Sequence, residues 1–123
     1  MSKSDAIEYC LSLTDVYIDY PFGSADDAGR WTVMRCRGNR KIFACVYTRA
    51  GRDYVSFKCE PLRGEFLRSV YKSLTPAYHL NKNHWSMVEL SGDVPDDELK
   101  NCIRAGYELV KPKRATRKPS TAP

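Results

Sequence analysis

The sequence predicts a single α+β domain, and three observations lead to that prediction. The chain has 123 residues, which is enough for one domain with its own core. Apolar and polar residues alternate between residues 31 and 59, as in strands that bury one face. On either side of that region, apolar residues recur three and four positions apart, as in amphipathic helices.

The first half of the chain predicts one helix and three strands. A helix is expected over 4–13, because Ile7, Cys10 and Leu11 share one face behind a serine cap. The segment 14–30 carries Pro and Gly and is read as bend and loop. Strands are expected over 31–37, 41–49 and 52–59.

The second half predicts two helices and one strand. A helix is expected to start at Pro61 and end before Thr75, with an apolar stripe of Leu62, Phe66, Val70 and Leu74 and with Leu67 and Tyr71 beside it. A strand over 85–90 and a last helix from about 94–98 to 110 complete the domain, 1–110.

Turn lengths in the predicted hairpins fix which side chains share a face. With turns at 38–40 and 50–51, the core face collects Met34, Cys36, Ile42, Ala44, Val46, Val55, Phe57 and Cys59. The opposite face collects Arg35, Arg37, Lys41, Phe43, Tyr47, Arg49, Tyr54, Ser56 and Lys58. The second face is therefore expected to be basic, with aromatic rings between the cations.

Charge is unevenly distributed along the chain. The net charge is +5, and residues 111–123 alone carry five basic residues and no acid. The domain is therefore neutral overall, yet residues 30–72 hold eleven basic residues and three acids. Such segregation favours an acidic partner. The tail, 111–123, is expected to be disordered.

Cysteine usage and hydropathy suggest a cytoplasmic protein. The five cysteines are widely spaced and odd in number, which is typical of reduced thiols and not of a disulfide framework. The N-terminal residues are read as a helix start and not as a secretory signal, and no apolar run is long enough to span a membrane.

No motif for catalysis, cofactor binding or metal binding is found. The cysteines form no closely spaced pair, and His79 and His84 lie five positions apart, so a metal site is not expected. A cysteine nucleophile with one of these histidines as base has no activating signal in the sequence. A non-enzymatic function without a cofactor is therefore expected.

The basic and aromatic sheet face is the best candidate site, because nucleic-acid-binding proteins combine cations for phosphates with rings that stack. The alternative is an ordinary solvated face, in which Trp85 anchors its strand to the core. The residues expected to contact phosphates are Arg35, Arg37, Lys41, Arg49, Lys58, Lys82, Lys113 and Arg114, and those expected to stack on a ligand are Tyr47, Tyr54, His84 and Trp85.

Short segments in a fixed order resemble the MmcQ/YjbR family of small bacterial proteins. They are Tyr9-Cys10-Leu11, Tyr20-Pro21-Phe22-Gly23, Lys41-Ile42-Phe43-Ala44, Lys58-Cys59, Tyr78-His79, Asn81-Lys82, His84-Trp85, Val94-Pro95-Asp96, Glu98-Leu99 and Tyr107-Glu108-Leu109-Val110. The resemblance implies a CyaY-like fold, with helices on one face of an antiparallel sheet and the other face open. It also implies DNA binding in a double-wing arrangement, by analogy of fold.

We therefore expect a DNA-binding protein of low sequence specificity, with a monomer favoured and no membrane partner. The alternative is a protein-interaction or small-ligand module that uses the aromatic concavity around Tyr47, Tyr54 and Trp85. Binding by the first would be steeply salt-dependent, whereas binding by the second would survive high salt.

Overall fold

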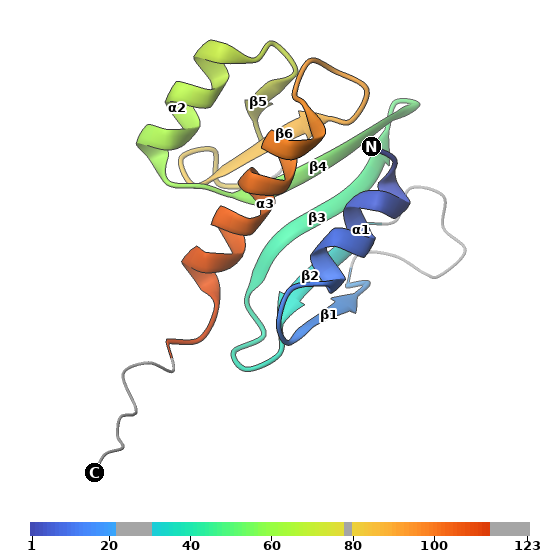
Figure 1. The fold of residues 1–123 in the computed structure, drawn as a ribbon, viewed down its shortest axis with the longest axis vertical. Coiled ribbons are helices and arrows are strands. Elements are labelled where there is room, and N and C mark those ends of the chain that lie inside the picture. Colours follow the sequence, from blue (N-terminus) through green and yellow to red (C-terminus); the bar gives the residue numbers. More distant parts are fainter. Residues whose placement is uncertain (22–30, 78–79, 114–123) are drawn as a thin grey trace.

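The fold is a six-stranded antiparallel sheet with three helices, which confirms the predicted α+β class and adds two strands to the four that were predicted (Figure 1). The computed structural model describes residues 1–21, 31–77 and 80–113. The sheet order is β1-β2-β3-β4-β6-β5, and α1 and α3 lie in front of the sheet in Figure 1. The elements are α1 Lys3–Leu11, β1 Val16–Asp19, β2 Thr32–Cys36, β3 Ile42–Arg49, β4 Arg52–Lys58, α2 Pro61–Val70, β5 Leu74–Pro76, β6 Trp85–Glu89 and α3 Asp96–Val110.

Both terminal helices begin where the sequence signals place a helix start. At α1, the Asp5 amide donates to Ser2 Oγ at 3.0 Å and the Ser2 amide donates to Asp5 Oδ2 at 3.0 Å. This capping box starts the helix one residue earlier than predicted. Three acids occupy the first turn of α3, where they complement the helix dipole. No helix in the described part of the chain is long and apolar enough to cross a membrane.

The predicted register holds for β3 and β4 and is wrong at the start of β3. Tyr47 lies opposite Tyr54 as expected, but the pairing of β2 with β3 shifts between Met34 and Arg35, so Arg35 lies opposite Ile42. An extra residue in one strand turns the next side chain to the other face. Phe43 therefore points to the helices, where its ring meets the Tyr107 ring edge-on, with centroids 5.3 Å apart.

The predicted places of Phe43 and Ile42 are corrected accordingly. Phe43 was expected on the basic face and is fully buried in the main core. Ile42 was expected in that core and packs against the cluster on the opposite face. The shift occurs beside a tight turn in which Arg40 has a φ of 62°. This is a left-handed conformation that an arginine in the sequence does not predict.

The two edge strands, β1 and β5, were not predicted because each is short. β1 has four residues, and the alternation of Val16 and Ile18 with Tyr17 and Asp19 is the only signal for it. β5 has three residues and begins at Leu74, which was expected on the apolar face of the preceding helix.

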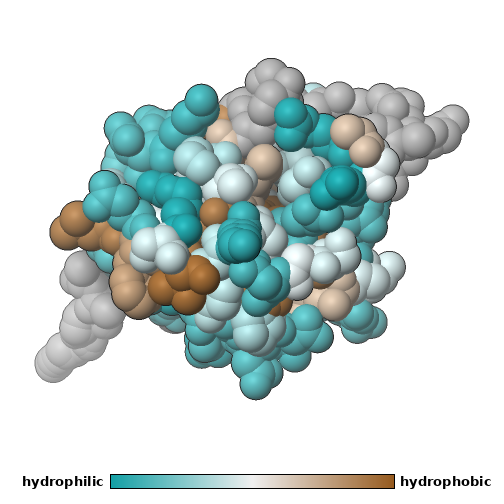
Figure 2. All heavy atoms as spheres, turned by 90° about the horizontal axis from the view of Figure 1, so that it is seen from above, coloured by the Kyte–Doolittle hydropathy of each residue, from teal (hydrophilic) through white to brown (hydrophobic). Residues whose placement is uncertain are grey.

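Helix α2 buries only part of the apolar side predicted for it. Its buried residues are Gly64 and Leu67, whereas Leu62, Phe66 and Val70 are 80%, 64% and 50% exposed. A Cβ atom on Gly64 would come within 3.3 Å of Ser86 Oγ, so the glycine permits close packing on β6. The apolar spacing identified a helix correctly but not which side of it is covered. Figure 2 shows apolar residues exposed on the side of the molecule where α2 lies.

Asp93 joins the loop after α2 to the loop before α3. Its Oδ2 accepts from the Lys72 amide at 2.9 Å, and its Oδ1 accepts from the Ser73 amide at 2.9 Å and the Ser73 hydroxyl at 2.6 Å. The Ser73 hydrogen bonds, with that of Lys72, lower the pKa of Asp93 from its usual 3.8 to about 2.

We expect this carboxylate to contribute stability that is lost in acid. Because the pKa is lower in the folded chain than in the unfolded chain, the contribution is complete above about pH 4 and disappears as the pH falls through about 2. Asp93→Asn should therefore flatten the decline of Tm over that range, measured by circular dichroism. Glu65→Gln, an exposed change of equal charge on α2, is the control, and equal flattening in both variants would contradict the assignment.

Candidate nucleic-acid interface

The sheet face turned away from the helices, here called the helix-free face, has an apolar centre. Val33, Cys45 and Tyr47 are buried there, and the Trp31 ring stacks on the Tyr47 ring with centroids 4.0 Å apart and planes at 7°. The Tyr47 hydroxyl lies 2.8 Å from Ser56 Oγ, and burial raises its pKa. Tyr47 is thus part of a second core and does not lie on the surface as predicted. Tyr54 remains half-buried beside it, at 5.7 Å between centroids.

Two of the arginines on this face are neutralised by neighbouring strands. Arg35 Nε donates to Asp19 Oδ2 at 2.8 Å, and its Nη1 donates to the Arg40 carbonyl at 2.7 Å. Arg52 Nη1 lies 3.2 Å from both carboxylate oxygens of Glu89. Arg35 was predicted to contact phosphate, but its charge is already partnered by β1. The Arg52–Glu89 pair is exposed, and exposed pairs contribute little stability, so Arg52 can exchange its partner at low cost.

Two other cations lie over aromatic rings. The guanidinium carbon of Arg37 is 5.2 Å from the centroid of the Tyr17 ring. Lys58 Nζ is 5.5 Å from the centroid of the Trp85 ring, its partner in the β4–β6 register. Trp85 is buried and acts as a platform for Lys58, so its indole is not open for stacking on a base. A cation over a ring keeps its charge available to an anion.

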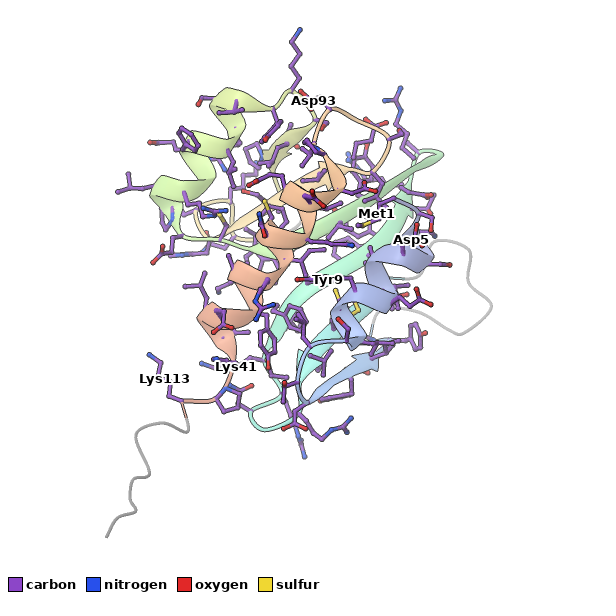
Figure 3. All side chains as sticks on the ribbon, viewed as in Figure 1. Met1, Asp5, Tyr9, Lys41, Asp93 and Lys113 are labelled. Carbon is purple, nitrogen blue, oxygen red and sulfur yellow. The ribbon has the colours of Figure 1, made fainter. Side chains whose placement is uncertain are left out.

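One end of the sheet collects most of the predicted phosphate-binding residues. β2 ends there, β3 starts, β4 ends and β6 starts, as the strand register requires. We call this the basic end and define it by Arg37, Arg40, Lys41, Lys58, Lys82, Lys111 and Lys113. One of these cations, Lys111, forms an ion pair with Glu108, with 2.7 Å between Lys111 Nζ and Glu108 Oε1. Figure 3 labels Lys41 and Lys113 together at this end, where α3 finishes, and Asp93 at the other.

The basic end is held together by contacts between the β2–β3 turn and the end of α3. Asn39 Nδ2 donates to the Val110 carbonyl at 2.7 Å. Pro112 packs on Gly38 so closely that a Cβ on that glycine would lie 2.7 Å from the proline ring. The chain therefore leaves α3 beside the turn that carries Arg37, Arg40 and Lys41.

The remaining predicted residues are dispersed. Arg49 lies at the far end of β3, opposite Arg52, so it is not part of the basic end. His84 is exposed in the turn before β6, and its carbonyl accepts from the Cys59 amide at 2.8 Å. Arg114 lies outside the described residues.

The five cysteine thiols are buried, which disfavours the nucleophilic thiolate form. All five cysteines are buried and unpaired, and burial raises the pKa of Cys10, Cys45 and Cys102 to about 12. His84 is exposed, and His79 lies outside the described residues. Within the ranges that the structure describes, no cluster of three or more ligating side chains could hold a metal ion.

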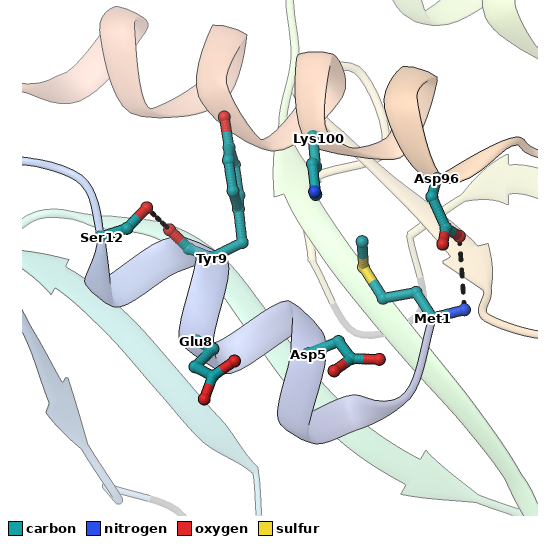
Figure 4. Close-up of a pocket in the computed structure, with 7 residues that line it drawn as sticks. All are labelled: Met1, Asp5, Glu8, Tyr9, Ser12, Asp96 and Lys100. Atoms are coloured by element: carbon teal, nitrogen blue, oxygen red, sulfur yellow. Dashed lines mark hydrogen bonds and ion pairs between the residues drawn. The ribbon is translucent and has the colours of Figure 1, made fainter.

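A groove of about 560 Å³ lies between α1 and α3, on the helix side of the sheet (Figure 4). Its polar groups are largely engaged within the protein. Asp96 binds the Met1 ammonium at 3.3 Å, Asp5 belongs to the capping box, and Lys100 Nζ lies 5.7 Å from the Tyr9 ring centroid. A small molecule could enter this groove, but the predicted site residues do not line it.

Several residues of the site were missed by sequence reasoning. Arg40 and Lys111 belong to the basic end because the β2–β3 turn meets the end of α3, a contact between residues far apart in the sequence. Asp19, which neutralises Arg35, was missed with β1. The alternation over residues 16–19 was the available signal.

Comparisons with known proteins give a consistent result. The protein-family model described as YjbR matches residues 11–109 of this chain. The chain is 30% identical over 108 residues to "Uncharacterized protein YjbR" of Escherichia coli (strain K12), covering 88% of this chain and 86% of that one. It is 29% identical over 100 residues to "Uncharacterized protein YbdF" of Escherichia coli O157:H7, covering 81% and 76% of the two chains.

Two solved structures share the fold. A crystal structure of a Pseudomonas syringae protein has a TM-score of 0.77 and 26% identity, covering 90% of this chain and all (100%) of that one. Protein DR2400 of Deinococcus radiodurans, whose title names the domain DUF419, has a TM-score of 0.74 and 32% identity, covering 96% of this chain and 80% of that one.

Proposed function

The chain belongs to the YjbR family, and from that premise we propose that it binds DNA with low sequence specificity through the basic end of its sheet. The observation that carries the proposal is the concentration of cations there. The seven cations come from both hairpin arms, the turn before β6 and the residues after α3, and one of them, Lys111, is paired with Glu108. A local positive field of this kind attracts a polyanion irrespective of its sequence.

The arrangement supports contact with phosphates more than with bases. Tyr47 and Trp85 are buried, so the rings that could stack are withdrawn. Arg37 and Lys58 stand over the Tyr17 and Trp85 rings and present their charges outward. Contacts to phosphate position a protein on DNA but carry no direct sequence information.

The tail extends the same site in this proposal. Residues 114–123 contain Arg114, Arg117 and Lys118 and no acid, and they follow Lys113 at the basic end. The proposed setting is the cytoplasm, because five buried unpaired thiols suit a reducing compartment.

We expect Arg37→Glu combined with Lys41→Glu to weaken binding to a random-sequence DNA duplex and to make it less dependent on salt. Each lost phosphate contact lowers the slope of log K against log salt by about 0.9, so the slope should fall by about 2. Fluorescence anisotropy at several salt concentrations measures both quantities.

The matched control reverses the same number of charges on the helix side. Lys100→Glu with Arg104→Glu changes two exposed residues of α3 away from the basic end. This control should keep the wild-type slope, and an equal loss in both variants would reduce the proposal to a nonspecific charge effect.

Deleting residues 114–123 should lower the slope of log K against log salt by up to about 3, because three basic residues are removed. An unchanged slope would remove the tail from the site.

The alternative function, a small-ligand or protein-interaction module, is distinguished by the same titrations. The groove between α1 and α3 is the hollow that would serve it. Binding there would persist at high salt and would be weakened by Lys100→Glu instead of by changes at the basic end.

A further inference from the structure

The exposed apolar residues of α2 form a continuous stripe. Leu62, Phe66 and Val70 stand four residues apart on successive turns, and all three are at least half exposed, at 80%, 64% and 50%. The opposite side of the helix, Gly64 and Leu67, is packed against the body of the protein. Contiguous exposed apolar residues on a monomer often mark an interaction site.

We infer that this α2 stripe joins two copies of the chain in an antiparallel dimer, with a two-fold axis beside Phe66. The stripe is symmetric in spacing about Phe66, with Leu62 four residues before it and Val70 four residues after it. A two-fold axis there brings Phe66 of both copies together and sets Leu62 of each copy against Val70 of the other. A long side chain then meets a shorter one, which is the self-complementarity that a two-fold interface requires.

The charges at the two ends of the stripe favour the antiparallel arrangement. Glu60 precedes α2 and Lys72 follows it, and both side chains are exposed, with no ion pair to any described residue. Antiparallel pairing places Glu60 of each copy near Lys72 of the other, whereas parallel pairing would bring like charges together.

The two arginines within α2 do not oppose this contact. Arg63 Nη2 lies 3.6 Å from Glu98 Oε2, and Arg68 Nη1 donates to Ser86 Oγ at 3.2 Å, so both guanidinium groups are engaged by their own chain. Glu65 borders the stripe one position from the two-fold axis, so the Glu65 side chains of the two copies lie on the same side of the contact, beside Ser69. The dimer departs from the monomer expected from sequence, where the same residues were grouped on the apolar side of the helix.

The first test is the mass of the full chain in solution as a function of concentration, measured by sedimentation. The wild type should be dimeric, and Phe66→Glu should raise the dimer Kd roughly a hundredfold or more, because a central aromatic is lost and a charge is inserted. Leu109→Glu, at an exposed leucine of α3, is the control and should leave the Kd unchanged. A wild type that is still monomeric at about 100 µM overturns the proposal, as does equal dissociation by both variants.

Cysteine crosslinking tests the orientation, because the native thiols are buried and do not compete. Under mild oxidation Phe66→Cys should form a disulfide-linked dimer. Leu62→Cys alone should not, but a mixture of Leu62→Cys and Val70→Cys should. Efficient crosslinking of Leu62→Cys to itself would indicate a parallel contact and overturn the arrangement.

A monomer that binds lipid vesicles and loses that binding with Phe66→Glu would assign the stripe to a membrane surface instead.

Neither test depends on DNA. Loss of the dimer with intact DNA binding, or the reverse, therefore separates the failure of this inference from the failure of the proposed function.

Discussion

Replacing Phe43 with alanine is expected to lower the free energy of unfolding by about 3–5 kcal/mol, the usual cost of deleting a buried phenyl ring. Phe43 is fully buried, and its ring packs edge-on against Tyr107 of α3. The neighbouring layers are a helix and a strand, which cannot both move to fill the space. Since small domains are stable by only about 5–15 kcal/mol, the variant should show a much lower urea midpoint, measured by circular dichroism.

Ile42→Ala is the matched control because it removes the adjacent side chain on the other face. Ile42 is only partly buried, so its loss should cost under about 2 kcal/mol. A regular hairpin without the register shift would reverse the order, with Ile42 in the core and Phe43 on the surface. A larger loss for Ile42→Ala would therefore contradict the bulge between β2 and β3.

Replacing Gly106 with alanine is expected to destabilise the protein by roughly 1–3 kcal/mol, although alanine is the better helix former. A Cβ on Gly106 would lie 2.7 Å from the Lys58 carbonyl oxygen and 3.2 Å from the Lys58 amide nitrogen. Both are backbone atoms of β4, so they cannot rotate away as a flexible side chain would. The helix must instead move off the sheet, which loosens contacts along α3.

The control for this substitution is Asn101→Ala, at an exposed position of the same helix. It should stabilise the chain by about 0.5 kcal/mol through helix propensity alone. Urea unfolding of both variants measures the difference. If Gly106→Ala were as stable as the wild type, α3 could not lie as close to β4 as the structure places it.

Regular strands could be predicted from sequence because alternation and turn length fix their pairing. The two-residue turn at Ala50 and Gly51 set Tyr47 opposite Tyr54 and Val46 opposite Val55, and the structure has both pairs. The bulge near Phe43 could not be predicted, because it depends on the conformation of one turn. Because of this bulge, Ile42 and Phe43 lie on the faces opposite to those predicted for them.

The face that a helix buries was the less predictable property. In α2 the periodicity grouped Leu67 with the apolar residues at 62, 66 and 70, yet only Leu67 of these is buried. The packed side is chosen by Gly64, whose lack of a side chain allows close contact with β6. A glycine is a weak signal in a hydrophobicity pattern, although it decides the packing here.

The candidate site was predictable in composition but not in shape. The excess of cations over residues 30–72 was visible, yet the partners that neutralise Arg35 and Arg52 come from other strands. The clustering of Lys41 with Lys113 depends on contact between the β2–β3 turn and the end of α3. Contacts between distant segments of this kind require the folded structure.

The short edge strand β5 has a consequence for aggregation. The Ala77 amide donates to Trp85 of β6, and the Ser73 carbonyl accepts from Glu89. By alternation, Leu74 and Pro76 turn their backbone groups to the free edge. The Leu74 amide already donates to the Tyr71 carbonyl at 3.3 Å, and a proline has no N–H group. Over residues 74–76, the free edge of β5 therefore offers no backbone N–H group to an incoming strand. The addition of further strands to this edge, as in fibril growth, is disfavoured on the side where α2 lies.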